Sequence, residues 1–157
     1  MRSVAWFHAA SLVLSGTLAA QQPAPSDPGT QLRGVFEEVT ELVVKSAELV
    51  PADKYGFQPN ATVRTFGQLV AHVADGNNYY CARAGGQKVE WSDAVEKTTT
   101  DKAAIMQKLK ASIALCAAQH ATSSTAPQLL SNYGHLNLHY GNMVTYLRLM
   151  GMVPPSS

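Results

Sequence analysis

Hydrophobic residues recur every three or four positions along four stretches of the chain, and this spacing predicts four α-helices. The first helix should end at Pro51, with a buried face formed by Leu32, Val35, Val39, Leu42, Ser46 and Leu49. The second should run from about Thr65 to Arg83, just before Gly85. Residues 52–64, which lie between these two helices, are predicted to form an ordered loop over the bundle.

The second half of the chain continues the same pattern after a polar connection over residues 87–100. Asp101 is a typical N-cap residue for the third helix, which should reach about Gln119. The fourth should begin near Pro127 and end before Gly151. Four helices without a strand pattern indicate an all-α fold, and an up-and-down four-helix bundle is the favoured architecture.

Residues 1–20 have the pattern of a secretory signal peptide. Arg2 is followed by an apolar run over residues 4–18 and then by the small residues Ala19 and Ala20. A permanent membrane anchor is the alternative, but the run is shorter than the roughly 20 residues that a membrane span needs. We therefore expect cleavage after one of the two alanines, no permanent membrane anchor, and a periplasmic or secreted protein.

The mature chain is expected to be close to neutral. Residues 21–30 are rich in proline and are predicted to form a disordered leader, and residues 31–157 should form one domain. Loss of Arg2 with the signal peptide leaves 11 basic residues, one fewer than the 12 in the full chain, against 11 acidic residues. This composition provides no basic stripe for nucleic acid, so that partner is not expected.

Three histidines are the candidate chemistry of the chain. His135 and His139 stand four apart, a spacing that places both imidazoles on one face of a helix, with Cβ atoms about 6 Å apart. His72 lies in the second predicted helix and supplies a third ligand if the two helices are neighbours. Three histidines would leave one coordination position open, which is typical of catalytic rather than structural zinc sites.

The seam around this histidine pair is unusually polar for the inside of a bundle. It carries Asn132, His135, His139, Asn142 and Tyr146 at spacings of three or four. Buried polar groups need partners, and a metal ion is one such partner. The alternative is that the two histidines face solvent while residues 143 and 147 point inward. The glutamate of the HExxH metalloprotease motif is absent, so peptide hydrolysis is disfavoured.

Four further segments are distinctive: FGQLVAHVAD at residues 66–75, HYGNMVTYLR at 139–148, GMVPP at 151–155 and VPADKYGFQP at 50–59. They resemble segments of the DinB superfamily, and especially of its secreted bacterial branch. The resemblance covers about residues 31–157. It implies a four-helix bundle in which His72 on the second helix and the pair His135 and His139 on the last hold a divalent metal, nickel or zinc.

The resemblance also bears on function. It implies a metal-dependent enzyme of the transferase or hydrolase type, acting on an unknown small-molecule substrate, because characterised relatives include thiol transferases. A non-catalytic, metal-dependent binding or structural module is the alternative. Relatives are often dimeric, so a homodimer is possible. Two departures concern the pocket mouth: the segment 121–131 is shorter than is usual, and Leu138 stands where relatives tend to be polar.

Cys81 and Cys116 are the only cysteines, and an even pair in an exported protein is often oxidised. In antiparallel neighbouring helices the two residues would lie at opposite ends. They would meet if residues 85–100 ran back along the bundle and made the second and third helices parallel. One intramolecular disulfide is predicted, with two buried free thiols as the alternative.

The sequence also suggests roles for two further residues, Asp75 and His120. Asp75, one turn after His72, either accepts the free imidazole N–H of that histidine or is solvated. His120 lies at the end of the third helix, where the helix dipole favours a cation, and is assigned a structural role.

Overall fold

The computed structural model describes residues 27–157, so the predicted signal peptide and residues 21–26 of the predicted leader lie outside the described residues. The elements are α1 (Pro28–Leu49), a short 3₁₀-helix η1 (Ala52–Lys54), α2 (Phe66–Ala84), α3 (Ala94–Thr98), α4 (Lys102–Thr122) and α5 (Pro127–Leu149). All the described elements are helices, as predicted.

Helix α1 begins earlier than the hydrophobic pattern indicates, so residues 28–30 are helical rather than part of a leader. Asp27 causes this earlier start, because its carboxylate accepts hydrogen bonds from the backbone N–H groups of Gly29 and Thr30. Pro28 occupies the first turn, where its missing N–H is not needed.

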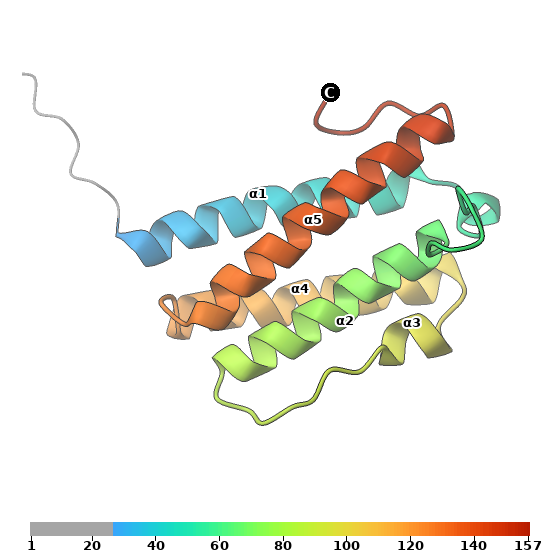
Figure 1. The fold of residues 1–157 in the computed structure, drawn as a ribbon. Helices are drawn as coiled ribbons and strands as arrows, with labels where there is room; N and C mark the ends of the chain where they lie inside the picture. Colours follow the sequence, from blue (N-terminus) through green and yellow to red (C-terminus); the bar gives the residue numbers. More distant parts are fainter. Residues whose placement is uncertain (1–26) are drawn as a thin grey trace, which may run out of the picture.

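The four long helices form a bundle in which each one packs against two of the others (Figure 1). Helix α2 packs against α4 and α5, and α1 packs against the same two helices. The connection from α2 to α4 runs back along the bundle, so these two helices are parallel, as are α1 and α5. The order is therefore not the simple up-and-down one, and the long crossover is the reason.

Local sequence explains where the later helices begin. The Thr65 hydroxyl accepts from the Gln68 backbone N–H, while the Gln68 side chain accepts from the Thr65 N–H, which together form a capping box. Asp101 caps α4 by accepting from the Ala104 N–H at 3.0 Å. Both starts agree with the predicted positions.

Helix α3 is the element that periodicity did not predict. It is one short turn within the polar connection, and Asp75 of α2 holds it in place. The Asp75 carboxylate accepts from the backbone N–H groups of Val95 at 2.9 Å and Glu96 at 3.0 Å. This contact places α3 against the middle of α2, beside the predicted histidine site.

The loop before α2 is fixed at two points. Tyr55 is buried and donates its hydroxyl to the Ala47 carbonyl at 2.7 Å. Tyr146 of α5 donates to the Arg64 carbonyl at 2.7 Å, which ties the end of the loop to the last helix. A side chain at Gly67 would come within 3.1 Å of the Tyr55 ring, so glycine allows this close approach. The loop therefore holds Arg64 in a defined place.

A disulfide joins Cys81 and Cys116, whose Cα atoms are 5.1 Å apart. The parallel course of α2 and α4 brings both cysteines to the same end of the bundle, which is the arrangement that the predicted disulfide requires. Both residues are fully buried. None of the helices in the described part of the chain combines the length and apolar character that spanning a membrane requires.

Candidate metal centre

The fold brings His72, His135 and His139 together between α2 and α5. One ring nitrogen from each lies within 4.8 Å of the others. The Nε2 atoms of His72 and His135 are 3.3 Å apart. Two nitrogens that share a tetrahedral zinc ion at about 2.0–2.1 Å would be separated by about 3.3 Å, so this spacing suits one ion.

Gly76 makes room for the His135 ring. It lies one turn after His72 on α2, and a Cβ atom there would stand only 2.2 Å from Cε1 and 2.5 Å from Nδ1 of His135. Any larger residue would push the imidazole away from α2. The close approach of α5 to α2 at the triad therefore depends on this glycine.

The three imidazoles are held in their neutral form. Burial, together with the neighbouring imidazoles and Arg64, lowers the pKa of His135 to about 3. The same causes lower the pKa of His139 to about 4, and burial also lowers the pKa of His72. Because only a neutral imidazole can bind a metal, the site is ready for an ion near neutral pH.

The fit to a metal is supported by buried nitrogens that lack a protein partner. Nδ1 of His135 and Nδ1 of His139 make no hydrogen bond within the described residues. The nitrogens that face each other across the triad, Nε2 of His72 and Nε2 of His135, have only each other as a partner among the described residues, so an ion between them would complete both. The donor set of three imidazoles suits zinc and nickel.

Carboxylates from α3 face the outer nitrogen of His72. Its Nδ1 atom lies 3.2 Å from Oε2 of Glu96 and 3.8 Å from Oδ1 of Asp93. Such partners fix the tautomer of a metal-binding histidine and leave Nε2 free for the ion. Asp75 does not do this, and it is not solvated either, because it is buried and bonded to the α3 backbone. Both hypotheses for Asp75 are wrong.

A second group of possible ligands consists of His72, Asp93 and Glu96. Its carboxylates already have other partners. Glu96 Oε1 accepts from Arg64 Nε at 2.9 Å, and Asp93 accepts from Trp91 Nε1 at 2.8 Å. The three-histidine group has no such competing partners on its free nitrogens, so it is the better candidate for the ion.

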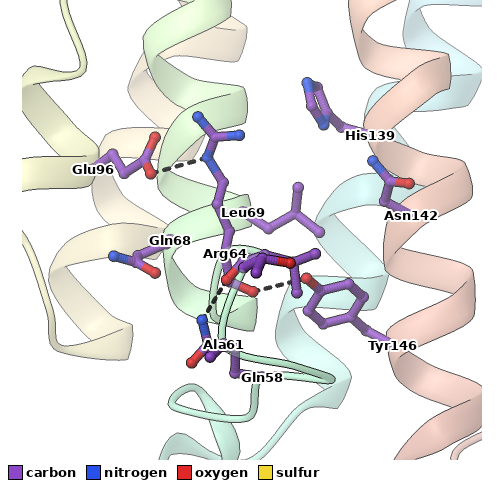
Figure 2. Close-up of a pocket in the computed structure, with 11 residues that line it drawn as sticks. Gln58, Ala61, Arg64, Gln68, Leu69, Glu96, His139, Asn142 and Tyr146 are labelled. Atoms are coloured by element: carbon purple, nitrogen blue, oxygen red, sulfur yellow. Dashed lines mark hydrogen bonds and ion pairs between the residues drawn. The ribbon is translucent and has the colours of Figure 1, made fainter.

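A cavity of about 620 Å³ opens beside the triad. Arg64 and Glu96 line one side of it, and His139, Asn142 and Tyr146 line the other from α5 (Figure 2). Clefts of this volume accommodate small metabolites. None of the residues 121–131 lines the cavity, and neither does Leu138, which is 63% exposed. The two sequence departures therefore do not alter this opening.

Residues 35–154 match the sequence profile of the DinB superfamily. The chain belongs to the DinB superfamily. No curated protein and no solved structure gives a significant match. Membership covers most of the bundle, including all three histidines, and agrees with the helical fold and with the possible metal centre of this DinB protein.

An aromatic wall, formed by Trp91, Tyr79 and Tyr80, borders the triad. The Trp91 ring lies 5.3 Å from His72 and 5.8 Å from His135, measured between ring centroids. Tyr79 and Tyr80 pack against Trp91 at 5.3 Å and 6.3 Å. These rings shield the histidines from solvent on this side, which contributes to their burial.

The remaining polar candidates have different environments. Asn132 is buried and donates to the disulfide sulfurs at 3.6 Å and 3.4 Å, away from the triad. Asn142 lines the cavity. His120 is fully buried against Phe36, with ring centroids 4.5 Å apart, so its structural role holds. Burial lowers its pKa, however, so the helix-dipole argument for a cation is wrong.

The sequence interpretation missed the residues that surround the triad. Asp93 and Glu96 stand three apart, the spacing of an N-cap residue and the acidic residue of the first helical turn, which is a helix-start signal in the sequence. That signal could have revealed α3. Nothing in the spacing of Arg64 connects it with the histidines, because its proximity arises only from packing. Gly76 does stand four residues after His72 and therefore shares its helix face, but its contact with His135 is set by the packing of α5 against α2.

Proposed function

We propose that this DinB protein is a metal-dependent enzyme in which His72, His135 and His139 hold one divalent ion, zinc or nickel, and that its reaction is of the transferase or hydrolase type. The observation that carries the proposal is the convergence of three neutral ring nitrogens within 4.8 Å. Bound there, the ion would lower the pKa of a water or thiol, or polarise a carbonyl.

The cavity supports an enzyme over a purely structural metal site. Structural zinc sites are normally closed by four protein ligands, whereas three histidines leave a position for another molecule. His139 is one of the ligands and also lines the cavity, so a substrate there would reach the centre. Glu96 orients His72, and the aromatic wall limits the access of water.

The metal is tested by titrating zinc and nickel into metal-free wild type and four single variants. Replacing any one of the three histidines by alanine should weaken binding by orders of magnitude, about 10²-fold or more, because the loss of a ligand costs more than the 10–100-fold typical of an outer partner. His120→Ala is the matched control and should leave the affinity nearly unchanged. Equal affinity in His72→Ala would contradict the proposal.

We also propose that the protein acts outside the cytoplasm, after removal of its signal peptide. The disulfide supports an oxidising compartment, because disulfides persist there and are rare in the reducing cytosol. Amino-terminal sequencing of the mature protein should find a start just after Ala19 or Ala20. An intact Met1 on the soluble protein would contradict this location.

A further inference from the structure

Arg64 is the cation of the cavity beside the triad. Among the residues that line this cavity, only Arg64 and Glu96 carry a full charge. The guanidinium and the proposed ligand His139 line the same cavity from opposite sides (Figure 2). The Arg64 side chain is 39% exposed, so it can meet a molecule in the cavity.

The guanidinium is only partly engaged. Its Nε atom donates to Glu96 Oε1 at 2.9 Å, and this is its side-chain hydrogen bond within the described residues. The two terminal Nη groups have no partner there. A guanidinium held through Nε still presents both Nη groups as a planar fork, a geometry that matches the two oxygens of a carboxylate.

Several other polar residues of the cavity each have at least one partner within the protein. Gln58 donates to the Val63 carbonyl, Gln68 completes the capping box of α2, and Tyr146 donates to the Arg64 carbonyl. Asn142 faces Arg64 across the cavity, next to His139 (Figure 2). Its side-chain amide has no protein partner among the described residues. Gln68 uses only its Oε1 atom in that capping box, so its Nε2 group is a further donor, but Arg64 is the one lining residue whose free donors carry a positive charge.

Charge favours a carboxylate over a more highly charged group. Glu96 offsets part of the Arg64 charge, so the pair suits a monoanion better than a phosphate dianion. We propose that the Nη groups of Arg64, with Asn142 opposite, bind the carboxylate of a small substrate in this cavity, a step that rests on the proposed metal-dependent function.

The test uses the full mature protein loaded with cobalt(II), which replaces zinc and gives a charge-transfer absorption when a thiolate binds it. The probes are 3-mercaptopropionate and 3-mercaptopropionamide, which share the thiol and chain length and differ in the carboxylate. Wild type should bind the acid about tenfold to a hundredfold more tightly, the range expected for hydrogen bonds to a charged group.

Three variants separate the explanations. Arg64→Gln should remove the preference for the acid and leave the affinity for the amide unchanged. Arg83→Gln is the control for overall charge, because Arg83 stacks on Tyr79 outside this cavity, and it should behave like wild type. Glu96→Gln should retain the preference, because it leaves the guanidinium in place.

The outcomes are distinguishable. Equal binding of the two probes to cobalt-loaded wild type, or a preference that survives in Arg64→Gln, would overturn the role of Arg64. Failure of cobalt to bind wild type would instead overturn the proposed metal centre, and the carboxylate site with it.

Discussion

Two groups of polar or sulfur-containing residues lie along helix α2. A covalent bond joins one group to a neighbouring helix, whereas the other group has no such bond. Toward the carboxyl end of α2, Cys81 is bonded to Cys116 of α4, and Asn77 donates to Ser112 at 3.1 Å. We call these four residues, with Asn132, the disulfide layer. Each member forms a bond within the protein, although Oδ1 of Asn77 and Oδ1 of Asn132 have no partner among the described residues, and the covalent bond between α2 and α4 closes this end of the bundle.

The second group is the histidine triad, about one to two turns nearer to the start of α2. Its members approach one another closely, yet Nδ1 of His135 and of His139 remains without a protein partner. Buried nitrogens without a partner lower stability, and an ion shared by the three converging imidazoles would offset that cost. The comparison indicates that one layer serves the folding of the bundle and the other serves binding.

Removal of the disulfide should have the largest effect on stability and little effect on the metal. The bond closes a loop with a sequence separation of 35 residues. In the chain-entropy model such a loop contributes about 3 to 4 kcal/mol to the free energy of unfolding. We expect Cys81→Ala/Cys116→Ala to lose about this amount in urea unfolding.

The same double variant also tests the separation of the layers. Its affinity for zinc should stay within a few-fold of wild type, because no sulfur atom belongs to the triad. Thiol titration of denatured, unreduced wild type should find no free thiol. Two titratable thiols, or a collapse of metal affinity in the double variant, would refute the comparison.

Gly76→Ala should produce the opposite result. The new methyl group would stand 2.2 Å from the His135 ring and force it outward, so zinc affinity should fall about tenfold to a hundredfold, consistent with an overpacking penalty of about 1–3 kcal/mol. The free energy of unfolding of the metal-free protein should change less, because alanine favours a helix and the ring is only half-buried.

Gly34→Ala in α1 is the matched control for this substitution. A Cβ atom at Gly34 meets nothing within 4 Å, so only the helix propensity changes. Its zinc affinity should equal that of wild type. If Gly76→Ala also binds zinc like wild type, the fit of His135 against α2 is not important for the site.

The sequence predicted the long helices because periodicity and capping residues act locally. Thr65 and Asp101 mark helix starts that the structure confirms. The histidine spacing similarly indicated the triad, because helix geometry alone puts His135 beside His139. What local rules did not reveal are contacts set by packing: Asp75 holding α3, and Arg64 meeting Glu96 across 32 residues of chain.

A further expected effect is a pH dependence that belongs to the triad. The pKa of His135 is about 3 and that of His139 is about 4, both below the unfolded value of 6.5. As the pH falls below 6.5, these histidines gain protons in the unfolded chain but not in the folded one, so acid favours unfolding. Below about pH 3 this loss is complete.

We expect the metal-free protein to lose stability steadily between about pH 6.5 and 5, a window chosen because most carboxylates stay ionised there. Urea unfolding of wild type and of His135→Gln/His139→Gln should show a shallower slope in the double variant, while Cys81→Ala/Cys116→Ala keeps the wild-type slope. Equal slopes in wild type and the histidine variant would show that the triad is not held neutral by the fold.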